Sequence, residues 1–206
     1  MEITWLGRTC FRLKGRDGTV VTDPCPPESG YRYPKQASEI VTISRRDDPA
    51  CSYVDGVSGE PMVFDAPGEY EHGGILVTAI ASKLPDGARN IMFVIEIDGI
   101  RVGHLGRPAA ANPSAIDELK DVDVLLMPVG AGGSLSGATA ADVMTTIDPK
   151  IAVPMNFKTE EETLDLEPLD RFLKETGTKS EPQPKLTITR SSMPAELTVM
   201  LLHPRS

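Results

Sequence analysis

Residues 90–106 read NIMFVIEIDGIRVGHLG, two apolar runs that meet at Asp98-Gly99. An Asp-Gly pair between two apolar runs is a strong signal for a two-residue turn. The segment therefore predicts a β-hairpin with strands at residues 91–97 and 100–104.

The chain before this hairpin is predicted to be rich in strands. Short runs with β-branched or aromatic residues alternate with glycine turns, and the loop TDPCPPESGYRYP occupies residues 22–34. We expect PGEYEHGG, at residues 67–74, to form a turn. The predicted strands are residues 2–6, 10–13, 19–22, 39–44, 61–64 and 75–80.

The chain after the hairpin alternates helix and strand. The predicted helices are residues 113–119, 138–147 and 166–175, and the predicted strands are 122–129, 151–155 and 197–202. Asn112 is expected to cap the first helix and Ser136 or Thr139 the second. The order indicates a layered α/β protein. We expect a single domain over 1–206, with two βα halves at about 1–98 and 99–206.

The composition limits the classes of partner. The 206 residues carry a formal net charge of −9, which argues against a nucleic-acid partner. No apolar run approaches the length of a membrane span, and no signal peptide is expected. The three cysteines, Cys10, Cys25 and Cys51, form no CxxC pair and are expected to be buried free thiols. We therefore expect a cytoplasmic protein.

Seven segments together resemble one known superfamily. In order they are ITWLGRTCFRL, TVVTDP, EIVTIS, APGEYEHGGILVTAI, NIMFVIEIDGIRVGHLG, DVDVLLMPVG and IAVPMNFKT. Their order resembles the metal-dependent hydrolases of the metallo-β-lactamase superfamily, in particular the branch that resembles the ascorbate-lactonase-like proteins. The resemblance covers nearly the whole chain. It implies an αββα sandwich, in which two packed mixed sheets have helices outside.

The main metal-binding loop of that superfamily does not match. Its H-x-H-x-D-H motif follows a strand that corresponds to EIVTIS, and its four ligand positions fall on Arg45, Asp47, Pro49 and Ala50. Arginine stays charged, and proline and alanine side chains have no donor atom, so only Asp47 could contact a metal. The pair Asp47-Asp48 could bind a hard cation weakly, but we favour a solvated acidic loop.

The remaining ligand positions of the superfamily are also changed. The next histidine falls near Lys83 or Leu84, the bridging aspartate falls on Arg107, and the last histidine falls on Asn156. The branch has a histidine in its opening segment, and Arg8 occupies that position here. We therefore predict no metal ligand and no catalytic residue, and a vestigial cleft formed by Arg8, Asp23, Arg45, Asp47, Pro49, Ala50, Lys83, Leu84, His104, Arg107 and Asn156.

The chain has three histidines, which cannot rebuild the lost set. His72 is expected in a solvated turn, and His203 is expected to be exposed. His104 matches a position beside the superfamily's site, and we expect it to be structural and hydrogen-bonded. Removing metal ions would leave buried carboxylates unpaired, so we expect Arg107 or Arg45 to pair with Asp23, Asp47 or Asp48.

Three functions remain open. The first is a non-catalytic relative without a cofactor that acts as an assembly or regulatory partner, as a homo-oligomer or with another protein. The second is a metal-dependent hydrolase of the lactone or phosphodiester class, with zinc or another divalent metal at a displaced, non-standard site. The third is a small-molecule or anion-binding module that uses the old cleft. The sequence-based prediction is the first, in which the chain is not an enzyme. Fold alone does not choose among them.

Overall fold

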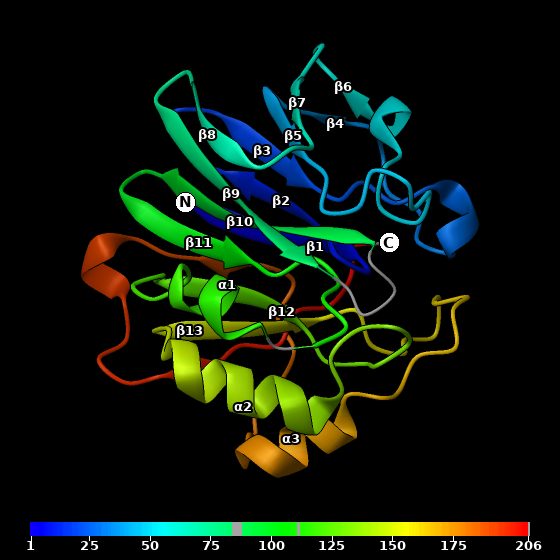
Figure 1. Ribbon diagram of the computed structural model, residues 1–206, viewed down its shortest axis with the longest axis vertical. Helices are drawn as coiled ribbons and strands as arrows, with labels where there is room; N and C mark the ends of the chain where they lie inside the picture. Colours follow the sequence, from blue (N-terminus) through cyan, green and yellow to red (C-terminus); the bar gives the residue numbers. More distant parts are fainter. Residues whose placement is uncertain (84–87, 111, 206) are drawn as a thin grey trace.

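The computed structural model describes residues 1–83, 88–110 and 112–205 (Figure 1). Two mixed β-sheets dominate the described chain, with three α-helices outside them. The two-layer architecture predicted from the sequence is confirmed. No described helix has the length and apolarity needed to cross a membrane.

The first sheet contains most of the strands from the start of the chain. Its order is β14-β1-β2-β3-β5-β7. The pairs from β14 to β3 are antiparallel, whereas β3, β5 and β7 are parallel. The strands are β1 (Glu2–Gly7), β2 (Cys10–Lys14), β3 (Thr19–Thr22), β5 (Ile40–Thr42), β7 (Met62–Phe64) and β14 (Leu186–Thr187).

The second sheet takes strands from both predicted halves. Its order is β15-β13-β12-β11-β10-β9-β8, parallel from β15 to β11 and antiparallel from there to β8. The small pair β4 (Gln36–Ala37) and β6 (Val57–Ser58) lies apart. The strands of the second sheet are β8 (Gly68–His72), β9 (Ile75–Lys83), β10 (Arg89–Ile97), β11 (Ile100–His104), β12 (Val124–Pro128), β13 (Ile151–Met155) and β15 (Thr198–Val199).

Helices α1 (Pro113–Asp117) and α2 (Gly137–Ile147) lie on the second sheet, and α3 (Asp170–Thr176) packs against α2 (Figure 1). Ser136 caps α2, because its side chain accepts a hydrogen bond from the Thr139 amide. Asn112 precedes α1 without a side-chain cap. In the described chain, three single 3₁₀ turns complete the regular structure, at Pro27–Ser29, Val54–Gly56 and Arg190–Ser192.

The core lies between the two sheets and under the helices. One continuous cluster of buried side chains includes Trp5 and Phe11 from the first sheet and Phe93 from the second. All residues of β12 and β13 are buried. Strands that are covered on both faces read as continuous apolar runs, which explains why these two strands show no alternation in the sequence.

The predicted hairpin is confirmed in register and in turn geometry. Ile97 pairs with Ile100, and both Asp98 and Gly99 have positive φ angles. The predicted turn over PGEYEHGG is wrong, because Gly68–His72 forms strand β8 and only Gly73-Gly74 turn. The third predicted helix is shorter than expected. Pro168 disfavours helical backbone at the residue before it, and α3 begins at Asp170.

Candidate functional site

Four strand ends and one turn meet at a common edge of the sandwich, which we call the strand-end edge. Arg8 lies in the turn between β1 and β2, and its carbonyl accepts a hydrogen bond from the amide of Asn156, after β13 (3.1 Å). The Ser44 carbonyl, after β5, accepts from the Ile91 amide of β10 (2.8 Å). Asp23 follows β3 and receives the Ser44 amide on its carboxylate (2.7 Å). The fold thus gathers residues that are up to about 150 positions apart in the sequence.

The backbone at this edge is held in an unfavourable conformation. Arg8, Asp23 and Asn156 have φ angles of 49°, 41° and 52°, in the left-handed region that residues with a side chain rarely adopt. Each such residue costs on the order of 1–3 kcal/mol and persists where the surrounding structure imposes it. Residues of this kind cluster at functional sites.

Asp23 is fully buried beside Ser44. Its second oxygen accepts a hydrogen bond from the Ser44 hydroxyl (2.6 Å). Burial raises the pKa of Asp23 above its usual value, and the bonds from Ser44 oppose that rise. The carboxylate therefore fixes the start of the loop that follows β5.

His104 has the structural, hydrogen-bonded role that the sequence predicts. Its ring is fully buried, and Nε2 lies 2.8 Å from the Thr9 carbonyl. The Gly106 amide donates to Nδ1 (3.2 Å). Nδ1 thus accepts a hydrogen bond, and Nε2 faces an acceptor. Both nitrogens are used, which leaves His104 without a free lone pair for a ligand.

Arg107 and Arg45 both pair with Asp48. Nη1 of Arg107 lies 2.7 Å from the Asp48 carboxylate, and Nη1 of Arg45 lies 3.7 Å from the same oxygen. Arg107 also donates to the Gly132 carbonyl (3.3 Å). The expected arginine–carboxylate pairing is thus confirmed with Asp48 as the partner. Asp47 is exposed, and Asp23 contacts Ser44 instead.

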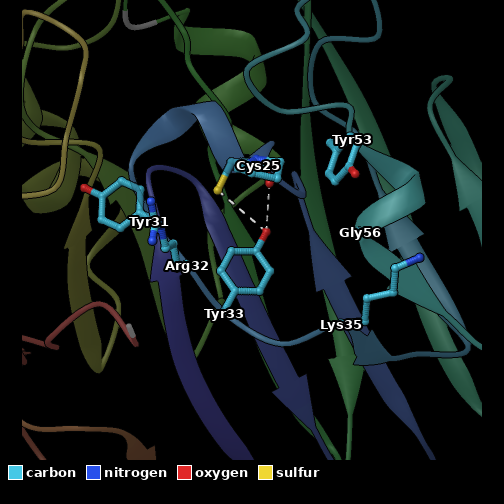
Figure 2. A pocket seen from close by; sticks show the side chains of 8 residues that line it. Cys25, Tyr31, Arg32, Tyr33, Lys35, Tyr53 and Gly56 are labelled. Carbon is cyan, nitrogen blue, oxygen red and sulfur yellow. Dashed lines mark hydrogen bonds between the residues drawn. The ribbon is translucent and has the colours of Figure 1, made fainter.

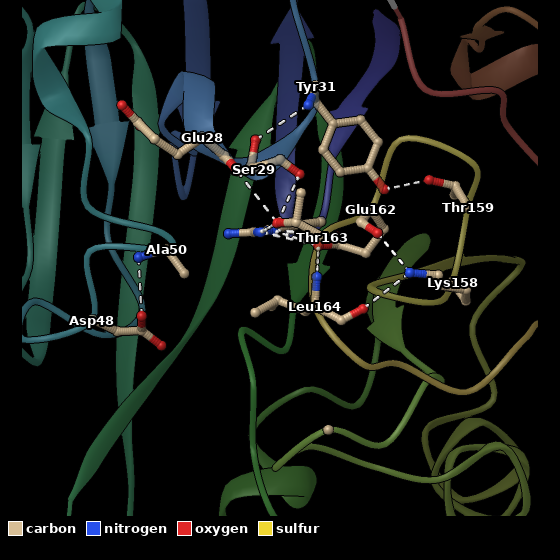
Figure 3. A network of polar contacts seen from close by, with 12 residues as sticks. Glu28, Ser29, Tyr31, Asp48, Ala50, Lys158, Thr159, Glu162, Thr163 and Leu164 are labelled. Carbon is tan, nitrogen blue, oxygen red and sulfur yellow. Dashed lines mark hydrogen bonds and ion pairs between the residues drawn. The ribbon is translucent and has the colours of Figure 1, made fainter.

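Arg8 pairs with a residue that the sequence analysis did not identify. Its Nε and Nη2 atoms lie 3.1 and 3.0 Å from one oxygen of Glu162, and both side chains are almost fully buried. The same oxygen accepts from the Leu164 amide (2.8 Å), and Lys158 donates to the Glu162 carbonyl (Figure 3). The run Glu160–Glu161–Glu162 carries no local signal that its last member is buried. Only the burial of Arg8 could have implied an acidic partner.

Two loops close over the Arg8–Glu162 pair. Thr163 accepts a hydrogen bond from Arg8 and donates to the Ser29 carbonyl, and Tyr31 bonds Thr159 (2.7 Å) (Figure 3). Gly30, with a φ of 95°, lets the loops meet, because a Cβ there would lie 1.8 Å from the Glu161 carbonyl oxygen. The loop after β3 and the loop after β13 are therefore joined over the strand-end edge.

Asn156 is fully buried, yet its side-chain amide has no hydrogen-bond partner among the described protein atoms. Nε of Arg107 is also buried without a partner in that part of the chain. Unpaired buried polar groups are costly and call for a partner that the protein itself does not supply. Both atoms belong to positions that the resemblance assigns to the superfamily's site.

Of the other predicted cleft residues, Pro49 and Ala50 have side chains without a polar atom and cannot pair with a charge. Pro49 is exposed, and Ala50 contributes its backbone amide to Asp48 (2.9 Å). Lys83 is the last residue of β9, and Leu84 lies outside the described residues. His72 and His203 are exposed, as expected, although His72 ends strand β8 rather than lying in a turn.

The described residues do not fit a divalent metal at the strand-end edge. Guanidinium groups occupy this region, where they pair with Glu162 and Asp48, and the Asp23 carboxylate is bonded to Ser44. Across residues 1–83, 88–110 and 112–205, no three His, Cys, Asp or Glu side chains lie close enough to hold one ion.

Comparison with known proteins identifies the family. The profile described as "Beta-lactamase superfamily domain" matches residues 2–156. A UPF0173 protein of Pyrococcus furiosus is 29% identical over 182 residues, which cover 79% of this chain and 86% of the relative. A UPF0173 metal-dependent hydrolase of Archaeoglobus fulgidus is 26% identical over 194 residues, covering 77% and 84%.

A solved structure agrees with these relatives. A proposed Zn-dependent hydrolase of the metallo-β-lactamase superfamily from Thermotoga maritima is 31% identical, with a TM-score of 0.82 and 98% of each chain covered. These names contradict two predictions, that the chain is not an enzyme and that it has no cofactor. Relatives named metal-dependent hydrolases point to an enzyme with a divalent metal. The resemblance itself is confirmed, and the chain belongs to the metallo-β-lactamase superfamily.

Proposed function

We propose that this protein is a metal-dependent hydrolase that acts on a lactone or a phosphodiester, and that its metal does not use the superfamily's usual ligand positions. The observation that carries the proposal is the similarity to the Thermotoga maritima protein over 98% of both chains, together with relatives named metal-dependent hydrolases. The changed residues at the strand-end edge require that the metal be bound differently from the superfamily's pattern.

The backbone of the strand-end edge supports a retained activity. Three residues with left-handed backbone, Arg8, Asp23 and Asn156, lie at strand ends that converge there. A chain selected only for stability would gain by relaxing such positions, because each one costs free energy. Their presence together supports a site that is maintained for use.

The test is hydrolysis by the purified protein against lactones, phosphodiesters and β-lactams, with zinc, manganese or magnesium added in turn. We expect turnover of a lactone or a phosphodiester with one of these metals. A matched control is Glu160→Ala, an exposed change two residues from Glu162. Turnover that Glu160→Ala retains and Asn156→Ala loses would support a reaction at this edge. Background rates for all three substrate classes with every metal would contradict the proposal.

A second candidate function is the binding of a small anion at the same edge. It is favoured by the side-chain Nδ2 of Asn156 and Nε of Arg107, which are buried hydrogen-bond donors without a partner among the described protein atoms. Inorganic phosphate is the probe. An upward shift of the thermal midpoint that is lost in Asn156→Ala supports this candidate, and an unchanged midpoint at millimolar phosphate contradicts it.

Self-association and a cytoplasmic location remain part of the proposal. Met62 and Val63 on edge strand β7 are 51% and 38% exposed, which supports a contact between copies of the chain. The three cysteines are free thiols, which supports a reducing compartment. Light scattering tests the first point, where a 22.2 kDa monomer at high concentration would contradict it. Fractionation of the source cells tests the second.

A further inference from the structure

A separate cavity opens beside the loop that follows β3, and we call it the tyrosine pocket. It has a volume of about 240 Å³ and is lined by Cys25, Tyr31, Arg32, Tyr33, Lys35 and Tyr53 among others. Figure 2 shows the Cys25 sulfur at its inner wall, facing the Tyr33 hydroxyl. None of these side chains belongs to the ion pairs of the strand-end edge.

Two thiols contact the Tyr33 hydroxyl, and one of them, Cys25, lines the pocket. The Tyr33 hydroxyl lies 3.6 Å from the Cys25 sulfur and 3.6 Å from the Cys10 sulfur, and it donates a hydrogen bond to the Cys25 carbonyl (3.0 Å). The Tyr33 hydroxyl is therefore the shared neighbour of the two sulfurs. Both are buried in a small apolar cluster that is separate from the main core. The pair is therefore fixed in place, with Cys25 on the pocket side.

The two thiols differ in acidity. The hydrogen bond from the Cys10 thiol lowers the pKa of Cys25 to about 7, with further help from Ser29 and Tyr33 against the effect of burial. Burial raises the pKa of Cys10. The thiolate is the nucleophile in thiol chemistry, so at neutral pH the sulfur that faces the pocket is the more reactive of the two.

The lining of the pocket selects a ligand class. Three tyrosine rings offer flat apolar faces, which favour an aromatic or planar body. Arg32 and Lys35 are exposed cations that line the same pocket, and they favour a carboxylate. A small, anionic, planar compound matches both features.

We propose that the tyrosine pocket is a thiol–disulfide exchange site, in which Cys25 attacks a small carboxylate-bearing disulfide and Cys10 resolves the product. In the first step the Cys25 thiolate forms a bond to one sulfur of the ligand, the ligand S–S bond breaks, and one thiolate leaves with the bonding electron pair. In the second step Cys10 attacks the Cys25 sulfur, gives up its proton to the second departing thiolate, and forms the Cys10–Cys25 disulfide. The ligand is reduced to two thiols, and the two protein thiols are oxidised.

The experiment uses dithiobis(nitrobenzoate), an aromatic disulfide with carboxylates whose released thiolate is coloured, and neutral dithiodipyridine as the matched reagent. The native protein is expected to release about two thiolates per chain and to retain no adduct. Peptide mapping should then find Cys10 joined to Cys25. Cys10→Ser should release about one thiolate per chain and keep the adduct on Cys25. Cys25→Ser should release no thiolate.

Two further variants test the pocket itself. Cys51→Ser, a change of the third buried thiol, should leave the reaction unchanged. The double variant Arg32→Ala Lys35→Ala changes two exposed positions. It should lower the rate of reaction with the anionic reagent by roughly tenfold more than the rate with the neutral reagent. Equal modification of all three cysteines, reaction only at the rate of global unfolding, or equal slowing of both reagents would each overturn the proposal. Circular dichroism confirms that each variant is folded before its rate is read.

Discussion

The strand-end edge and the tyrosine pocket share the loop that follows β3, but their charged side chains are arranged in opposite ways. At the edge, charged side chains are buried and neutralise one another, as Arg8 does with Glu162 and Arg107 with Asp48. In the pocket, the cations Arg32 and Lys35 are exposed and the inner wall is aromatic and thiol-bearing. Charge at the edge is therefore used to hold the loops together, whereas charge at the pocket is free to meet a ligand.

This difference separates stability from ligand recognition. A buried ion pair is strongly destabilising when one partner is removed, because the other charge stays buried without compensation. An exposed cation costs little to remove and acts mainly on the rate at which a ligand of opposite charge arrives. Substitutions in the two regions should then change different measurements.

The largest effect is expected at Glu162. Glu162→Ala leaves the buried Arg8 guanidinium unpaired and should lower the free energy of unfolding by about 3–5 kcal/mol. Urea denaturation measures the change, and Glu160→Ala is the exposed control, expected within about 0.5 kcal/mol of the parent. A loss at Glu162 no larger than that of the control would show that the pair does not hold the loops.

A smaller effect is expected at Arg107. Arg107→Ala should cost about 2 kcal/mol, below the Glu162 value, because Asp48 is partly exposed and keeps Arg45 as a second partner. Arg46→Ala is the matched control, since Arg46 pairs with Asp65 but its side chain is 74% exposed. If the two arginine variants unfold at the same urea concentration, Arg107 is not a buried partner in solution.

The smallest expected effect on stability, and the clearest effect on chemistry, lies in the pocket. The pKa of Cys25 is about 7, so its rate with dithiobis(nitrobenzoate) should fall about tenfold for each pH unit below 7 and level off above that value. An ordinary thiol would still gain in rate up to pH 8 or 9. The first stopped-flow phase of the native protein gives this profile. In Cys10→Ser, which lacks the Cys10 thiol that lowers the Cys25 pKa, the midpoint of the profile should lie at a higher pH, and equal midpoints in the two proteins would contradict this prediction.

The sequence predicts the frame of this molecule better than its sites. Asp98-Gly99 predicts its own hairpin, because the turn conformation depends only on those two residues. Strand β8 was missed because glycines and a proline surround it, and pairing with β9 outweighs their local preference.

The site partners depend on contacts that no local pattern records. Glu162 lies 154 residues from Arg8, and its burial follows from two loops that close on each other. The sequence predicts Cys25 to be a buried free thiol, and the structure confirms this. It does not predict that the Tyr33 hydroxyl contacts both Cys25 and Cys10, because that contact depends on the course of the loop after β3. Local patterns of residue type predict strands and turns. Side-chain pairs between distant segments can be predicted only when the three-dimensional fold is known.

The most direct test of the proposed hydrolase is metal content measured alongside turnover on one sample. The purified protein is stripped with a chelator, reconstituted with one divalent metal at a time, and analysed for metal per chain and for hydrolysis of lactones and phosphodiesters. The account predicts that activity falls on stripping and returns in proportion to the bound metal, approaching about one ion or more per chain. Turnover that is unaffected by complete stripping, or stoichiometric metal with no turnover of either substrate class, would contradict it.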